Sequence, residues 1–172
     1  MDEYIKLAEK SIENYLNGKS LKVKTGKLPK EMTEKKAGVF VSLHKKDSSD
    51  LRGCIGTFLP TKTNLAQEII SNARSAAFSD PRFAPLEKDE LNNLEIKVDV
   101  LNQPELLKSK DDLNPKKFGV IVKNDSGQTG LLLPNLEGIN TTDEQLSIAC
   151  QKAGFSPEEN YQIYRFTVTR HQ

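Results

Sequence analysis

The sequence predicts an α+β fold, organised as a single two-lobed domain of mainly antiparallel sheet with flanking helices. Two pairs of short β-rich segments, each joined by a polar turn, indicate β-hairpins. Amphipathic stretches with helical spacing stand between and beside them. Because the strands come in hairpins and do not alternate one by one with helices, this pattern favours antiparallel sheet over a doubly wound parallel sheet.

The beginning of the chain predicts one helix followed by a loop. Residues 4–16 carry apolar side chains at helical spacing, separated by lysines and glutamates, which is typical of an amphipathic helix. Asn17 and Gly18 end this pattern. Residues 21–36 contain six lysines, Pro29 and few apolar side chains, so we expect a surface loop there.

The first hairpin is expected over residues 38–58. β-branched and aromatic side chains fill residues 38–43, a polar turn follows at 45–50, and the second strand covers 51–58. This second strand contains the most distinctive segment of the sequence.

A second helix is predicted at residues 64–78, where Thr63 or Asn64 suits the cap position before a stripe of leucine, isoleucine and alanine. The loop that follows contains Pro81 and Pro85. Because proline cannot continue a helix and fixes its own backbone, these residues predict a rigid loop.

The middle of the chain predicts further strands. A short helix at residues 88–92 leads into a strand at 94–100, whose strict alternation indicates one solvent-facing side. Residues 118–122 and 128–133 flank the polar turn 124–127 and predict the second hairpin.

The last segments carry clear helix signals. Thr141 and Glu144 form the sequence pattern of a capping box, which predicts a helix that Gly154 closes in a left-handed conformation. Residues 156–159 predict another turn of helix, and alternation over residues 164–169 predicts a terminal strand.

Length and composition indicate one globular domain, since the 172 residues are 36% hydrophobic and 28% charged. No run approaches the roughly 18 apolar residues that span a bilayer. The opening Met1-Asp2-Glu3 lacks the basic-then-apolar order of a signal peptide, so we expect a cytoplasmic protein. The net charge of +1 gives no general attraction to nucleic acid or to an anionic membrane.

The supply of metal ligands is small. Cys54 and Cys150 lie far apart, so neither a disulfide framework nor a zinc site is expected. His44 and His171 are the only histidines, and they stand in unrelated segments. We therefore expect no metal and no cofactor.

The segment Arg52-Gly53-Cys54-Ile55-Gly56 places a cysteine between two glycines, directly after an arginine. Glycine inside a strand marks a bulge or the close approach of a backbone or ligand. A nearby cation favours thiolate over thiol, and strand alternation puts Arg52 on the same face as Cys54. In the alternative reading, Cys54 is a small buried hydrophobe and the glycines only permit tight packing.

Together with Leu51, this segment matches the signature of the AMMECR-one domain family, the protein A partner of the AmmeMemoRadiSam gene set. The chain resembles this family over nearly its whole length, which implies one α+β domain over residues 1–172 with two unequal lobes. The resemblance implies a Memo-like protein, related to ring-cleaving dioxygenases, and a radical S-adenosylmethionine protein as partners, but it supplies no activity. Further matching blocks are residues 76–83, 85–86, 94–98, 130–134 and 152–154.

In an enzyme, Cys54 would be the nucleophile. Arg52 would stabilise the thiolate or anchor a small anionic ligand, and Gly53 and Gly56 would allow a substrate to approach the backbone.

Asp80, Arg82 and Glu95 are the polar residues expected around this cysteine. Glu95 serves as general base if burial raises its pKa, and His44 is the other candidate. Asp80 and Arg82 have an alternative reading as an ion pair that fixes the proline-bounded loop.

Two other classes of function stay open. The lack of a second strong catalytic residue favours a non-catalytic binding module that docks onto a partner protein. A nucleic-acid surface at the lysines of residues 22–36 is the least favoured, because Glu31 and Glu34 interrupt them and no aromatic residue stands between them. Cys150 is expected in the core.

Overall fold

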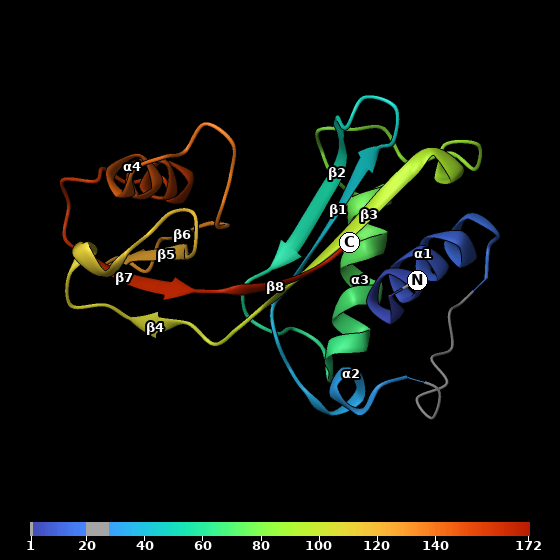
Figure 1. The fold of residues 1–172 in the computed structure, drawn as a ribbon, viewed down its shortest axis with the longest axis horizontal. Coiled ribbons are helices and arrows are strands. Elements are labelled where there is room, and N and C mark those ends of the chain that lie inside the picture. Colours follow the sequence, from blue (N-terminus) through green and yellow to red (C-terminus); the bar gives the residue numbers. More distant parts are fainter. Residues whose placement is uncertain (1, 20–27) are drawn as a thin grey trace. The chain divides into compact units, whose positions relative to one another are not determined.

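The protein was analysed as a computed structural model, which describes residues 2–19 and 28–172 (Figure 1). The chain divides into two compact units. Unit 1 comprises Met1–Leu101 and Thr169–Gln172, and unit 2 comprises Asn102–Val168. Each unit combines an antiparallel sheet with helices, so the predicted α+β class is confirmed.

The sheet of unit 1 has the strand order β2-β1-β3-β8. These strands are β1 (Val39–Lys45), β2 (Leu51–Thr57), β3 (Leu94–Leu101) and β8 (Val168–His171). β1 pairs antiparallel with both β2 and β3, which confirms the first predicted hairpin and leaves β2 at an edge of the sheet.

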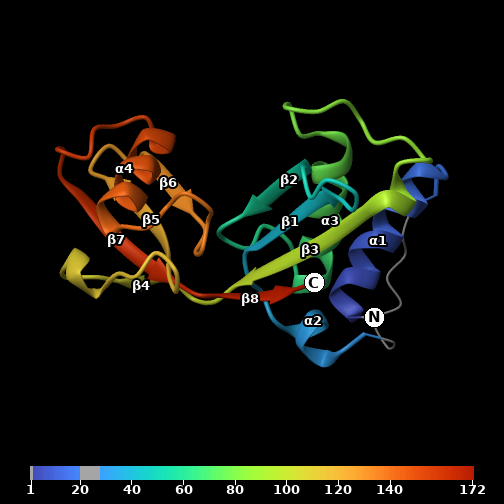
Figure 2. The ribbon, with the colours of Figure 1, turned by 45° about the horizontal axis from the view of Figure 1, so that its top comes forward.

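Two helices cover one face of this sheet, α1 (Glu3–Leu16) and α3 (Leu65–Phe78), and they lie side by side in Figures 1 and 2. α1 begins after Asp2, whose side chain accepts a hydrogen bond from the backbone N–H of Tyr4. Asn64 caps α3 as expected, by accepting from the N–H of Gln67. The core between helices and sheet contains fully buried side chains, among them Ile12, Val39, Val41, Leu43, Ile69, Ala73 and Val98.

The predicted surface loop at residues 21–36 is wrong for its last part. Lys30–Glu34 form a short helix, α2, because Met32 packs fully buried into the core and orders this segment. Residues 20–27 lie outside the described residues. The short helix expected at 88–92 is also displaced, since only a 3₁₀ turn forms there, η2 at Leu91–Asn93.

The sheet of unit 2 has the order β4-β7-β5-β6. The second predicted hairpin is confirmed, because β5 (Gly119–Asn124) pairs antiparallel with β6 (Thr129–Leu132). β7 (Tyr161–Phe166) lies on the other side of β5, and the two-residue strand β4 (Glu105–Leu106) forms the edge beside β7. A 3₁₀ turn, η3 (Lys110–Asp112), follows β4.

One helix, α4 (Thr142–Ala153), packs on β5 and β6. Its predicted capping box is present, since Thr141 accepts from the N–H of Glu144 and the Glu144 carboxylate accepts from the N–H of Thr141. Gly154 ends the helix with φ of 83°, as expected.

The terminal strand predicted over residues 164–169 is two strands. β7 ends at Phe166 and belongs to the sheet of unit 2, whereas β8 begins at Val168 and belongs to the sheet of unit 1. Residues 156–159 form a turn and not a turn of helix.

Candidate functional site

Cys54 lies on the edge strand β2, opposite Ser42 of β1. Its backbone N–H donates to Oδ2 of Asp80 at 2.9 Å, and its carbonyl accepts from Nη2 of Arg82 at 3.2 Å. Both backbone groups therefore point away from β1 and are held by side chains of the loop that follows α3. The structure thus brings together Cys54, Asp80 and Arg82, as the proline-bounded loop predicted.

Asp80 and Arg82 also bind each other. The Arg82 guanidinium donates to both carboxylate oxygens, from Nε at 3.0 Å and from Nη2 at 2.8 Å. The hydrogen bond from Arg82 holds the pKa of Asp80 well below its usual value, and the backbone N–H of Cys54 acts in the same direction. The Asp80 side chain is 2% exposed and that of Arg82 is 55% exposed, so the pair is anchored on its acidic side.

The charge interaction between Arg82 and Cys54 is a further feature of this group. The pKa of Arg82 is raised, most of all by its hydrogen bond with Asp80, and the charge interaction with Cys54 adds to this effect. A thiolate at Cys54 is therefore within electrostatic range of the guanidinium.

Arg52 is placed differently from the prediction. It falls at a register shift between the paired positions Leu51 and Gly53, so strand alternation does not set its direction. Its side chain is buried and donates twice to Glu90, from Nε at 2.6 Å and from Nη2 at 2.9 Å. This pairing lowers the pKa of Glu90. The charge of Arg52 is thus directed to Glu90, a partner that sequence reasoning missed because nothing in the spacing links two residues so far apart.

The two glycines are accounted for by packing within unit 1. A β-carbon at Gly53 would overlap the carbonyl oxygen of Ala76 in α3, and a β-carbon at Gly56 would overlap the ring of Phe40. The close approaches predicted from these glycines exist, and protein atoms make them. This agrees with the packing alternative for the two positions.

The two candidate bases lie two positions along the sheet from the pair formed by Ser42 and Cys54, on the same face. Glu95 lies on β3, beyond β1, and pairs in register with His44, whereas Cys54 is in register with Ser42. Glu95 is exposed and forms an ion pair with Lys97 at 3.3 Å. Nδ1 of His44 lies 3.2 Å from the carbonyl oxygen of Ser49 in the hairpin turn.

The two cysteines differ in environment. Cys150 is fully buried in the core of unit 2, as expected, and burial raises the pKa of its thiol. Cys54 is only partly buried. Of the two cysteines, Cys54 is therefore the more exposed residue.

Comparison with known proteins agrees with this fold. A family model described as AMMECR1, the AMMECR-one domain, matches residues 5–171. The chain belongs to the AMMECR1 family.

Relatives within the AMMECR1 family cover the chain almost completely. A protein of Thermotoga maritima is 48% identical over 170 residues, which is 98% of this chain and 97% of that protein. A protein of Clostridium acetobutylicum is 49% identical over 172 residues, or 99% of this chain, but this match is only 36% of that protein. The crystal structure of the uncharacterized protein PH0010 from Pyrococcus horikoshii superposes with a TM-score of 0.86 at 33% identity, covering 97% of this chain and 88% of that one.

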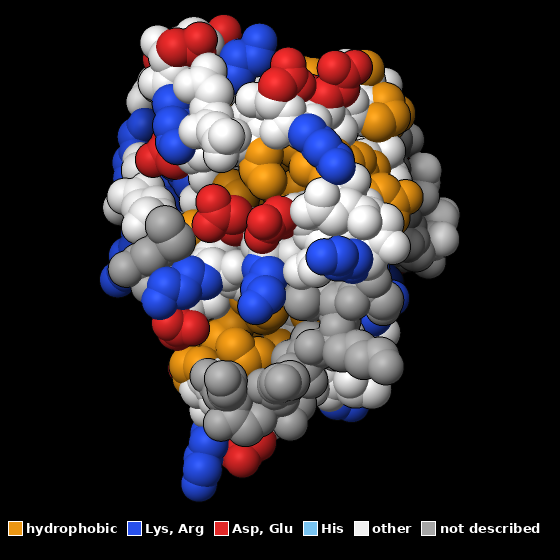
Figure 3. Space-filling view, turned by 90° about the vertical axis from the view of Figure 1, so that its right-hand side faces the viewer, with side chains coloured by type: hydrophobic (Ala, Val, Ile, Leu, Met, Phe, Trp, Pro, Cys, Tyr) orange, Lys and Arg blue, Asp and Glu red, His pale blue; other side chains and the backbone are white. Residues whose placement is uncertain are grey.

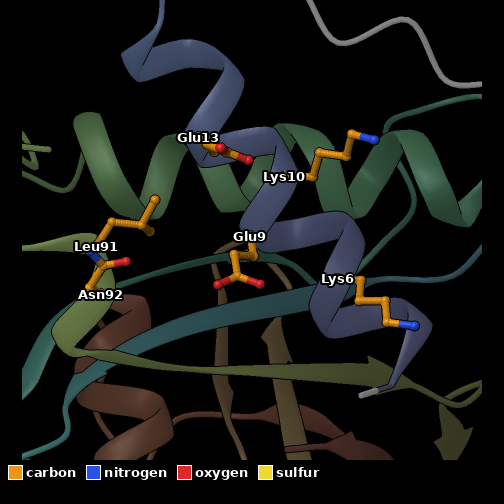
Figure 4. Close-up of a pocket in the computed structure, with 6 residues that line it drawn as sticks. All are labelled: Lys6, Glu9, Lys10, Glu13, Leu91 and Asn92. Carbon is orange, nitrogen blue, oxygen red and sulfur yellow. The ribbon is translucent and has the colours of Figure 1, made fainter.

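A hollow of this AMMECR1 domain lies between α1 and η2 and is not lined by Cys54. It has a volume of about 490 Å³ and is lined by Lys6, Glu9, Lys10, Glu13, Leu91 and Asn92. Figure 4 shows the amino groups of Lys6 and Lys10 directed away from Leu91 and Asn92. Figure 3 shows acidic and basic side chains interspersed on the face that it displays.

The described residues also bear on metals and membranes. Within residues 2–19 and 28–172, no group of three or more His, Cys, Asp and Glu side chains is arranged to hold a metal ion. Over the same ranges, every helix is too short or too polar to cross a bilayer.

Proposed function

We propose that unit 1 of this AMMECR1 domain carries a thiol-dependent small-molecule site at Cys54. The observation that carries the proposal is the position of Cys54 at the sheet edge, partly exposed, with its N–H bound to Asp80 and its carbonyl bound to Arg82. A fixed backbone gives the thiol a defined direction, which favours reaction with a bound ligand over random modification.

Arg82 supplies the electrostatics of the proposed site. A cation beside a cysteine favours the thiolate, which is the nucleophilic form. Because Asp80 compensates part of this charge, the effect is smaller than that of an unpaired arginine. A thiolate formed in this way needs no separate base, which is consistent with the positions of Glu95 and His44.

The exposed guanidinium also suggests the ligand. The Arg82 side chain is 55% exposed, so a further acceptor can approach its guanidinium from solvent. A carboxylate or phosphate oxygen is a suitable acceptor for arginine. The proposed ligand is therefore a small electrophile with one anionic group.

Thiol labelling tests this proposal. We expect iodoacetamide to label Cys54 about tenfold faster than Cys150 at neutral pH, as read by mass mapping after short exposure. In Arg82→Ala the rate at Cys54 should fall several-fold and its pH midpoint should rise. Arg165→Ala is the matched control, because Arg165 also pairs with a carboxylate, Glu105, but lies in unit 2. Equal labelling of both cysteines, or labelling of Cys150 alone, would contradict the proposed thiol site.

A ligand-binding experiment addresses the anionic group. Sulfate, phosphate or a small carboxylate should raise the melting temperature of the wild-type protein, and this shift should disappear in Arg82→Ala while Arg165→Ala retains it. A shift of the same size in folded Arg82→Ala removes Arg82 from the ligand site. A Cys54→Ser protein that binds the anion normally separates anion binding from thiol chemistry.

A non-catalytic binding module is the second candidate. Glu95 and His44 lie two positions along the sheet from Cys54, and this offset supports it. The proposed partners are the Memo-like and radical S-adenosylmethionine proteins implied by the family resemblance. Calorimetric titration with a purified Memo-like protein tests this candidate, and binding that is unchanged in Cys54→Ser supports docking over thiol chemistry. Absence of heat with both partner proteins rejects it.

A further inference from the structure

The edge of β2 is closed at one position by side chains and not by another strand. In an antiparallel pair, every second residue turns its N–H and C=O away from the partner strand. At Cys54 these groups meet one acceptor, Oδ2 of Asp80, and one donor, Nη2 of Arg82. A neighbouring strand would offer this same set of one acceptor and one donor.

The two side chains also bind each other, independently of their contacts with the strand. Besides the two hydrogen bonds between guanidinium and carboxylate, the backbone N–H of Arg82 donates to Oδ1 of Asp80 at 3.1 Å. The ring centroid of Phe83 lies near two cations, 5.5 Å from the guanidinium carbon of Arg82 and 5.9 Å from that of Arg52. The pair therefore has a fixed geometry that costs little entropy when it binds β2.

The rest of the loop is attached to unit 1 at further points. Leu86 is buried and its N–H donates to the carbonyl of Ala77 at 2.9 Å, while Glu90 binds Arg52 of β2. Residues 79–90 thus follow the edge strand and are tied to it at both ends.

We propose that the Asp80–Arg82 pair is an edge cap that prevents β2 from pairing with β2 of a second copy of this chain. An edge strand with unpaired backbone groups is a template for additional strands. We choose a second copy as the partner because of symmetry. If a twofold axis passes beside Cys54, the N–H of Cys54 in each copy can donate to the carbonyl of Cys54 in the other. Asp80 and Arg82 already occupy the N–H and the carbonyl of Cys54 with which such a strand would form hydrogen bonds.

The double variant Asp80→Ala, Arg82→Ala tests the cap without leaving a lone buried charge. We expect the amide of Cys54 to exchange hydrogen about ten- to a hundredfold faster than in the wild type at low protein concentration. The amide of Ile55, which pairs with β1, should change much less. Sedimentation equilibrium should show a mass that rises with concentration more steeply than the wild-type mass, while Cys54 becomes protected again.

Arg170→Ala is the matched control. Arg170 binds the buried carboxylate of Asp99 with two hydrogen bonds of 2.8 Å, but caps no backbone of β2. The Arg170→Ala protein should be less stable than the wild type but should not self-associate. If the double variant does not fold, Arg82→Ala and Asp80→Asn are measured by the same two readouts.

Two results overturn the proposal. One is exchange at Cys54 that is unchanged in every folded variant, since the pair then protects nothing. The other is fast exchange with the same mass as the wild type at all concentrations. Neither result depends on thiol labelling, so failure of the cap is distinguishable from failure of the proposed thiol site.

Discussion

Gly53 and Ala76 are in contact across the interface between β2 and α3, where the missing side chain of the glycine leaves room for the helix carbonyl oxygen. This contact fixes how closely the candidate strand approaches the helix behind it. Because the atom that a β-carbon would meet belongs to a helix backbone, the helix itself would have to move to make space.

Gly53→Ala is therefore expected to destabilise the protein by about 1–3 kcal/mol, the usual cost of overpacking. Gly56→Ala is the comparison, because its β-carbon would meet Cγ of Phe40, so the Phe40 side chain would have to move as a whole but no helix backbone would, and the cost should be smaller. Urea unfolding of both variants measures the difference. A Gly53→Ala protein as stable as the wild type would show that α3 yields easily.

Glu90→Gln should destabilise the protein by about 2 kcal/mol or more, because it leaves the buried guanidinium of Arg52 without its counter-charge. Lys6→Ala is the control, since Lys6 and Glu3 form an exposed pair whose loss should cost less than about 1 kcal/mol. Thermal and urea unfolding measure both. Equal effects of the two substitutions would contradict the assigned role of the buried pair.

The Asp80–Arg82 pair should make stability depend on pH. The pKa of Asp80 is lower in the folded than in the unfolded protein, so the pair stabilises the fold above about pH 4 and this stabilisation is lost as the pH falls further. In Arg82→Ala the deficit relative to wild type should be largest at neutral pH and should shrink below pH ~4. Urea unfolding from neutral pH to about pH 3 measures it, and a constant deficit would speak against the pair.

Thr141→Ala should destabilise unit 2 by about 1 kcal/mol, because the Thr141 hydroxyl accepts from the first turn of α4. Thr142→Ala is the control one position later, where the hydroxyl makes no capping bond. Amide exchange in α4 measures both. If the two variants exchange alike, the capping box contributes little.

Local signals explain what could be predicted from the sequence. The limits of α3 and α4 follow from Asn64, Thr141 and Gly154, residues that act on their own neighbours. The position of Asp80 and Arg82 beside Cys54 was also accessible, because Pro81 limits the course of the loop directly after a helix.

The missed features depend on residues distant in sequence. The alternation that predicted one terminal strand continues through Thr167, but the partner strands change there from β5 to β3. The distance along the sheet between Glu95 and Cys54 could not be predicted for a similar reason, because only the strand order shows that β1 separates β3 from β2. The bond between Arg52 and Glu90 has no counterpart in any short sequence pattern.

The return of the chain to unit 1 has a consequence for synthesis. Unit 2 stands between β3 and β8 along the chain, so the ribosome makes all of Asn102–Val168 before it makes Arg170, which pairs with Asp99. A nascent chain that ends within unit 2 therefore exposes an edge of β3 and a buried acid without its counter-charge. Such a chain is open to wrong pairing until β8 arrives, which makes ribosomal stalling inside unit 2 a specific hazard for this protein.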